Sequence, residues 1–170
     1  MCYKVISENE LARMNVEEID ALRSSISKKT LKELCFYDLC QPGKSCIGLY
    51  FIESPDKQKL YIGKSTSRSV CERIGGHLDS RSFAFCNSLP RKVAKAVSSG
   101  KPTDQELFDA LVEIGDWNIS VLFVECETLD LAKRLISKAE SLLISSCNGC
   151  INKSRRQSTP VPTGPLSSLI

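Results

Sequence analysis

Apolar side chains recur along the N-terminal part of the chain with a helical spacing. Between residues 7 and 34 they return every three to five positions, with acidic residues between them, which predicts a helix. A second, shorter helix is predicted from about Thr30 to Tyr37, because threonine is a favourable N-terminal cap. Gln41-Pro42-Gly43-Lys44 then has the composition of a turn. We therefore expect residues 1–46 to form an N-terminal helical extension.

Three short apolar runs farther along have the composition of strands. Ile47–Ile52 and Lys59–Gly63 flank Ser54-Pro55-Asp56-Lys57, whose residues favour a turn, so together they predict a hairpin. Trp117–Val124 predicts a third strand. The spacing of apolar residues and the capping patterns predict helices between and after these strands, at Val70–Leu78, 90–98, Thr103–Ile114 and Thr128–Ser146.

This order of elements predicts an α+β (α/β) fold. We expect one main domain over residues 47–153, with an antiparallel sheet of about three strands flanked by helices. Residues 154–170 contain three prolines and many serines and threonines, so we expect them to form a flexible tail.

Composition narrows the function only a little. A hydrophobic content of 42% can supply a core, and a net charge of +3 permits binding to a polyanion without requiring it. No run approaches the roughly 18 apolar residues that a membrane span needs, and Met1–Glu10 does not resemble a signal peptide. We expect a cytoplasmic protein without membrane contact, whose nine cysteines are reduced thiols.

The predicted hairpin carries two short motifs, and further polar residues follow at defined positions. Gly48-Leu49-Tyr50 lies on the first strand and Tyr61-Ile62-Gly63 on the second. Arg73 and His77 are four positions apart on the next predicted helix, which places them on one face. Glu140 lies on or beside the apolar face of the last predicted helix, and Asn152 follows that helix.

These residues, in this order and on these elements, resemble the GIY-YIG endonuclease superfamily, with Leu49 in place of its usual isoleucine. The resemblance covers about residues 47–153. The compact layout is most similar to the restriction endonucleases of that superfamily. It implies a metal-dependent endonuclease that hydrolyses phosphodiester bonds of double-stranded DNA, in a restriction or mobile-element setting.

The resemblance also implies a role for each site residue. Tyr50 would act as a general base toward the attacking water, or position it, and Tyr61 would hydrogen-bond the same network. Arg73 would neutralise charge on the scissile phosphate. His77 would relay a proton or bind a phosphate oxygen, and Lys64 would add positive charge. Glu140 would bind one Mg²⁺ or Mn²⁺, because a single carboxylate with several waters is a common magnesium site. Asn152 would close the motif.

Other interpretations stay open at this stage. A non-catalytic DNA-binding protein would have the same fold without the reaction. The cysteines offer a metal or redox module, but the chain holds a single CxxC pair, Cys147-Asn148-Gly149-Cys150, at a predicted helix end, so we expect no zinc site. The sequence also leaves a homodimer open. If DNA is the substrate, its backbone would follow a basic stretch formed by Arg81, Arg91, Lys92, Lys95 and Lys101.

Overall fold

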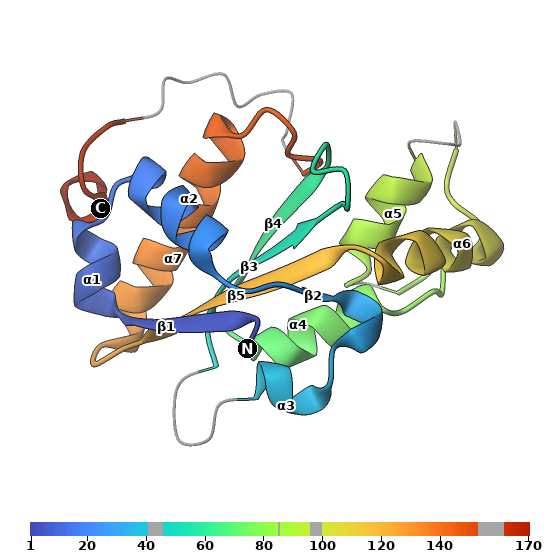
Figure 1. Ribbon diagram of the computed structural model, residues 1–170, viewed down its shortest axis with the longest axis horizontal. Coiled ribbons are helices and arrows are strands. Elements are labelled where there is room, and N and C mark those ends of the chain that lie inside the picture. The colour runs from blue at the N-terminus through green and yellow to red at the C-terminus, as the bar shows by residue number, and fades with distance from the viewer. Residues whose placement is uncertain (41–45, 85, 96–99, 153–161) are drawn as a thin grey trace.

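The computed structural model describes residues 1–40, 46–84, 86–95, 100–152 and 162–170. Its centre is a five-stranded mixed sheet with the order β1-β5-β3-β4, in which β2 also pairs with β5 (Figure 1). The strands are β1 (Tyr3–Ser7), β2 (Lys29–Thr30), β3 (Gly48–Glu53), β4 (Leu60–Ser65) and β5 (Asn118–Glu125).

The middle of the sheet is antiparallel and buried on both faces. β3 pairs antiparallel with both β4 and β5, whereas β1 runs parallel to β5. All six residues of β3 are buried, and apart from its last residue, Glu53, the strand is a continuous apolar run rather than an alternating one. β4 forms one edge of the sheet, and β1 forms the opposite edge.

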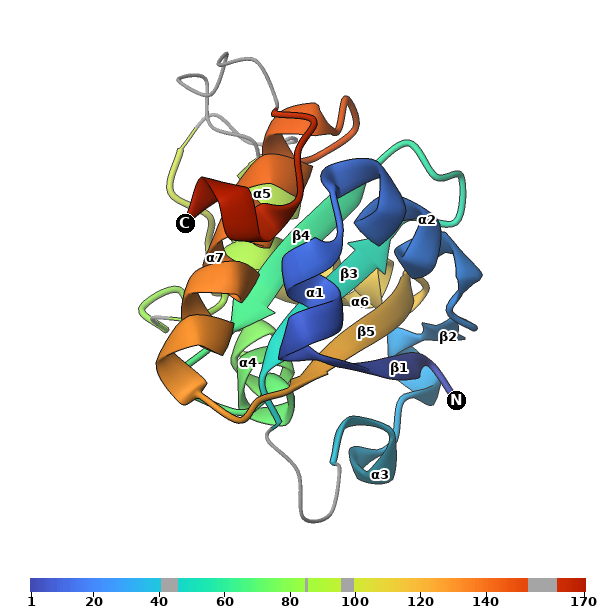
Figure 2. The ribbon, with the colours of Figure 1, turned by 90° about the vertical axis from the view of Figure 1, so that its left-hand side faces the viewer.

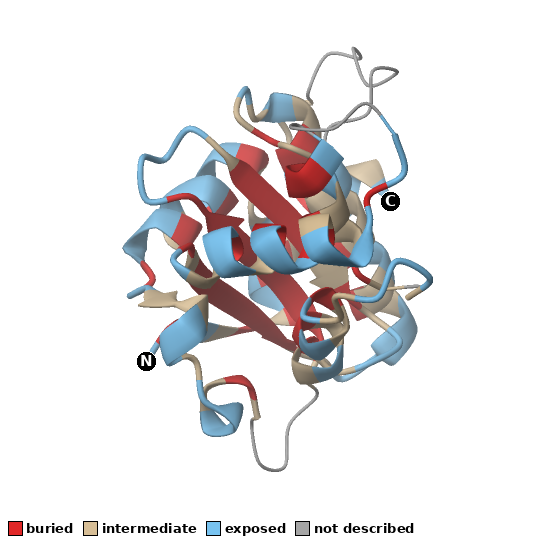
Figure 3. Cartoon of the chain, turned by 90° about the vertical axis from the view of Figure 1, so that its right-hand side faces the viewer, coloured by how far each residue is buried: buried red, intermediate tan, exposed pale blue. Residues whose placement is uncertain are grey.

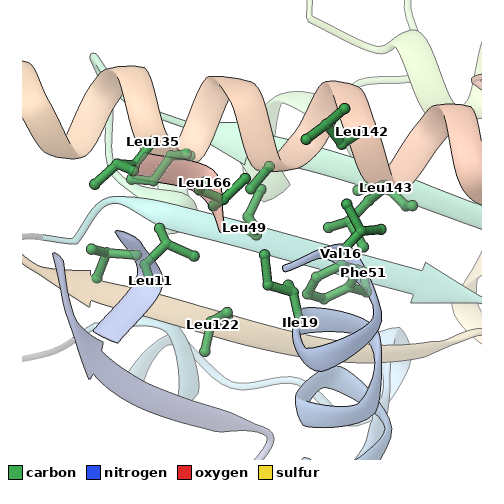
Figure 4. Close-up of a cluster of buried hydrophobic side chains, with 14 of the residues drawn as sticks. Leu11, Val16, Ile19, Leu49, Phe51, Leu122, Leu135, Leu142, Leu143 and Leu166 are labelled. Atoms are coloured by element: carbon green, nitrogen blue, oxygen red, sulfur yellow. The ribbon is translucent and has the colours of Figure 1, made fainter. Parts of the chain in front are cut away.

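Helices cover each face of this sheet (Figures 1 and 2). On one face α1 (Glu8–Arg13), α2 (Val16–Ser25) and α7 (Leu129–Ser146) enclose an apolar cluster that includes Leu49, Phe51 and Leu122 (Figure 4). On the other face lie α4 (Val70–His77), α5 (Ser88–Lys95) and α6 (Asp104–Gly115). Their outer surfaces are exposed while the strands behind them are buried (Figure 3).

The hairpin, the third strand and most helices agree with the sequence predictions. β3, β4 and β5 correspond to the three predicted strands, and α4, α6 and α7 match their predicted ranges to within about one residue. The predicted basic helix is α5, which begins two positions before residue 90 and includes Pro90 in its first turn. Residues 96–98 of that prediction and the predicted turn at 41–44 lie outside the described residues.

The expected sheet of about three antiparallel strands was wrong, because residues 1–46 add two more. β1 and β2 both pair with β5, and the β1 pairing makes the sheet mixed. The predicted helix over 7–34 is two helices, because the backbone becomes extended at Met14 and ends α1, and Asn15 then caps α2 through reciprocal hydrogen bonds with Glu18. The predicted Thr30–Tyr37 helix is a 3₁₀ turn, η1 (Leu31–Glu33), followed by α3 (Phe36–Leu39).

The C-terminal prediction also needs a correction. Leu166 of the 3₁₀ helix η2 (Leu166–Leu169) is fully buried in the apolar cluster between α1, α2, α7 and the sheet. Its amide donates to the Met14 carbonyl at 3.0 Å. A flexible tail was therefore wrong for residues 162–170, while residues 154–161 lie outside the described residues. Within the described residues, none of the helices has the length and apolar character needed to cross a membrane.

Candidate active site

The phenol of Tyr50 lies across the edge strand at a position that has no side chain. Tyr50 on β3 pairs with Gly63 on β4. A Cβ at position 63 would lie 2.1 Å from Cζ and 2.3 Å from the hydroxyl oxygen of Tyr50. Only glycine therefore allows the ring to cross β4 here, which gives the last glycine of the Tyr61-Ile62-Gly63 motif a physical reason.

His77 holds the Tyr50 hydroxyl from α4. Its Nε2 lies 2.8 Å from the Tyr50 oxygen, and its Nδ1 accepts from the Leu89 amide at 3.5 Å. Because Nδ1 is an acceptor, the proton of the neutral ring lies on Nε2, which donates to Tyr50. This leaves the hydroxyl proton of Tyr50 free to point toward another acceptor.

Tyr61 lies beside Tyr50 with a different partner. The two rings are stacked with their centroids 6.2 Å apart, and the Tyr61 ring meets His77 edge-on at 5.2 Å. The Tyr61 hydroxyl is 2.8 Å from the hydroxyl oxygen of Ser88, the first residue of α5. The three rings thus form one cluster, and each phenol has its own polar neighbour.

Burial and the Arg73 charge set the protonation of this cluster. Tyr50 is 0% exposed and His77 2%. Burial raises the pKa of Tyr50 and of Tyr61, and Arg73 opposes that rise in both. Burial and the nearby Arg73 guanidinium lower the pKa of His77 to about 4. At neutral pH both phenols are therefore protonated and the imidazole is uncharged.

Lys64 and Glu140 approach from the other face of the sheet. Lys64 on β4 pairs with Leu49, whose side chain points toward α7, and its ammonium is 2.9 Å from the Glu140 carboxylate. The Lys64 side chain is 36% exposed and that of Glu140 19%. The negative charge of Glu140 also raises the pKa of both phenols, after the larger effect of burial. The carboxylate therefore lies within electrostatic reach of the tyrosines, across the β4 edge.

Asn152 secures that edge instead of facing the tyrosines. Its side-chain amide donates to the Ile62 carbonyl at 2.6 Å and accepts from the Ile62 amide at 3.3 Å. Just before it, Gly149 and Ile151 bond to the backbone of Leu60. The turn after α7 thus satisfies the outer edge of β4 up to the residue that precedes Gly63.

The donor set suits one hard cation held by few protein ligands. Glu140 supplies a partly exposed carboxylate beside two phenols, and such an arrangement leaves coordination positions for water and a phosphate oxygen. Among the described residues, no three His, Cys, Asp or Glu side chains gather as a metal-ligand group. The residues thus fit a Mg²⁺ or Mn²⁺ bound through Glu140 with mostly non-protein ligands.

Two further residues belong to the site, although the sequence analysis assigned neither of them a role. Gly63 makes room for Tyr50, and Ser88 bonds Tyr61. A glycine opposite a tyrosine on a neighbouring strand is a signal that could have indicated the first. The second depends on how the segment between α4 and α5 folds back, which no local pattern encodes.

The predicted basic stretch is divided between different roles. Arg91 donates to the Asn87 side chain and to the carbonyls of Ser82 and Ala84, so it holds the segment before α5. Arg81 pairs with Asp79 at 2.5 Å. Arg81, Lys92, Lys95 and Lys101 are exposed, so four of the five predicted cations remain at the surface, as a track would require.

In comparisons with protein-family models, curated proteins and solved structures, nothing matched this chain. The functional argument accordingly rests on the residues of the site and on their geometry.

Proposed function

We propose that this chain is a metal-dependent DNA endonuclease of the GIY-YIG type, with the compact layout of a restriction or mobile-element enzyme. One observation carries the proposal. Two phenols, an imidazole and a guanidinium cluster on one face of the sheet, and a carboxylate paired with an ammonium on the other face lies within electrostatic range of both phenols. A purely structural cluster would not need these charged groups beside buried phenols.

Phosphodiester hydrolysis needs a positioned water and stabilisation of the charge that develops on the phosphoryl oxygens. Tyr50 is held by the His77 Nε2–H, so its oxygen is fixed and its proton is directed away from the imidazole. We assign Tyr50 to orient the attacking water through its fixed hydroxyl oxygen. To act as a base, the phenol must first lose its own proton to solvent, and the Arg73 guanidinium, which opposes the rise that burial causes in the pKa of Tyr50, favours that loss; the phenolate would then take up the proton of the water. Arg73 would neutralise the scissile phosphate, and Glu140 would hold a divalent cation, which would supply Lewis-acid stabilisation when bound.

Burial of the phenols supports a second candidate, a DNA-binding protein that retains this scaffold without cutting. Tyr50 is fully covered, and Tyr61 is 5% exposed. Under the nuclease proposal the partly exposed Lys64 and Glu140 side chains must move apart when substrate and cation bind. Under the second candidate they stay paired.

Incubation of the protein with supercoiled plasmid, with Mg²⁺ or with EDTA, decides between these candidates. The parent protein should nick or linearise plasmid when Mg²⁺ is present and should leave it intact in EDTA. Glu140→Gln should abolish cutting while keeping the melting temperature, and Glu127→Gln, which changes an exposed carboxylate just before α7, should cut normally. Plasmid that is bound but never cut would favour the second candidate, and cutting in EDTA would contradict the assignment of Glu140.

A further inference from the structure

The segment between α4 and α5 borders a hollow next to the candidate active site. The hollow has a volume of about 360 Å³ and is lined by Ser82, Phe83, Ala84, Ser88, Arg91 and Lys101. This volume falls within the range of roughly 300–1,000 Å³ that is typical of ligand sites. Ser88 belongs to both places, because its hydroxyl bonds the Tyr61 phenol. A molecule in the hollow would thus lie one side chain away from Tyr61.

Side-chain bonds to the backbone fix the described part of this segment in one shape. Asn87 is fully buried and donates to the carbonyls of Asp79 and Arg81, both at 2.9 Å. Arg91 bonds Asn87 and the carbonyls of Ser82 and Ala84. The Ser82 amide donates to Asp104 at 2.6 Å. The rim of the hollow is therefore organised without a ligand, as a binding surface requires.

Phe83 stands at this rim with most of its surface in water. It is 75% exposed, and the Arg81 guanidinium lies 5.1 Å from its ring centroid. An aromatic ring and a guanidinium are the groups on which unstacked nucleobases stack in proteins. Arg91 and Lys101 add positive charge to the lining, while Asp79 and Asp104 are engaged with Arg81 and the Ser82 amide.

We propose that this hollow binds an unstacked nucleotide of the DNA strand that enters the active site, with its base stacked on Phe83. The inference rests on the proposed function and extends it: the enzyme would distort its duplex next to the cut, and Phe83 would hold the displaced base. Stacking on one aromatic side chain contributes about 1–3 kcal/mol per base. Phe83 would thus account for a change in affinity of about 5- to 150-fold.

The test measures binding without cutting, in EDTA, by fluorescence anisotropy with a labelled oligo(dT) strand and with a labelled duplex of equal length. Phe83→Ala should bind oligo(dT) about tenfold more weakly than the parent at the same salt concentration. Phe83→Trp should keep the affinity, and its indole emission should be quenched by the strand. Phe108→Ala, which removes a 55% exposed phenylalanine from α6, is the matched control and should bind like the parent.

Three results separate this inference from the nuclease proposal. If Phe83→Ala binds both DNA forms as tightly as the parent, or if the parent binds neither, the inference is overturned. If Phe83→Ala weakens binding as expected but the parent never cuts plasmid in Mg²⁺, the nucleotide site stands and the nuclease proposal fails. Melting curves of both phenylalanine variants should match the parent, because neither ring is buried.

Discussion

Tyr50 on β3 pairs with Gly63 on β4, and the Tyr50 phenol fills the position that a Cβ at residue 63 would take. The contact explains why a tyrosine from the middle of the sheet can reach the β4 edge, where Lys64 and Glu140 meet. The position of the Tyr50 hydroxyl therefore depends on Gly63, which has no side chain and takes no part in the proposed reaction.

Under the proposed function, Gly63→Ala should therefore abolish DNA cleavage through its effect on Tyr50. The new methyl group would displace the phenol from His77, and overpacking of this kind costs about 1–3 kcal/mol of unfolding free energy. Gly75→Ala on α4 is the control, because a Cβ there meets no atom within 4 Å. Plasmid cleavage and urea unfolding of both variants test this. A Gly63→Ala protein with parental cleavage would show that the Tyr50 position does not matter.

Removal of single hydroxyls should separate the two tyrosines. Tyr50→Phe leaves the buried His77 Nε2–H without its partner, so it should lose most cleavage and about 1–3 kcal/mol of unfolding free energy. Tyr61→Phe frees only the half-buried Ser88 hydroxyl, which can turn to water, so its stability loss should be smaller. Equal stability losses would show that the buried Tyr50–His77 hydrogen bond contributes no more to the fold than the Tyr61–Ser88 bond.

The sequence predicted those elements whose periodicity or turn chemistry is local. β3, β4 and α7 were predictable because their apolar residues are continuous or recur at helical spacing. β1 was missed because Tyr3–Ser7 is short and half-buried, and its strand conformation depends on parallel pairing with β5, more than 100 residues away. Long-range pairing leaves little local trace in a sequence.

The same limit applies to the site. Tyr50, Tyr61, Arg73 and His77 were predicted together through the resemblance to the GIY-YIG superfamily, and the structure brings their side chains into one cluster. The sequence did not show that Lys64 forms an ion pair with Glu140, or that the Asn152 side chain hydrogen-bonds the backbone of Ile62. Both relationships depend on how α7 and the turn after it dock on β4.

The Lys64–Glu140 pair predicts competition between the ammonium and a bound cation. Lys64→Met keeps the length of the side chain and removes its charge, so Glu140 should become freer to bind a metal. An ion pair of this exposure contributes up to about 1 kcal/mol, which corresponds to a metal affinity about fivefold tighter. Calorimetric titration with Mn²⁺, without DNA, measures this change.

Cleavage should fall in the same Lys64→Met protein, because the charge that would help to neutralise the phosphate is gone. Lys4→Met is the matched control, since Lys4 is exposed on β1 at the opposite edge of the sheet. Its Mn²⁺ affinity and cleavage should equal those of the parent. If Lys64→Met binds Mn²⁺ no more tightly than Lys4→Met, the ammonium does not compete for Glu140.

His77 should make the fold less stable as the pH falls below neutrality. Its pKa is about 4 in the folded protein, and an unfolded histidine titrates near 6.5. Between these values the unfolded chain binds a proton that the folded chain does not, so the free energy of unfolding falls as the pH falls. The full window corresponds to about 3 kcal/mol, and the part between pH 6.5 and pH 5 to about 2 kcal/mol.

Urea unfolding at pH 7 and pH 5 measures this loss, and His77→Gln isolates it. The glutamine amide can still donate to Tyr50 but does not titrate, so the variant should lose little stability over this interval. Hydrogen bonds lower the pKa of Asp38 and of Asp79 to about 2. The stability that these two carboxylates contribute is therefore lost only at more acidic pH, outside the interval between pH 7 and pH 5. If the parent and His77→Gln lose the same free energy between pH 7 and pH 5, His77 is not the neutral, buried donor that holds the Tyr50 hydroxyl.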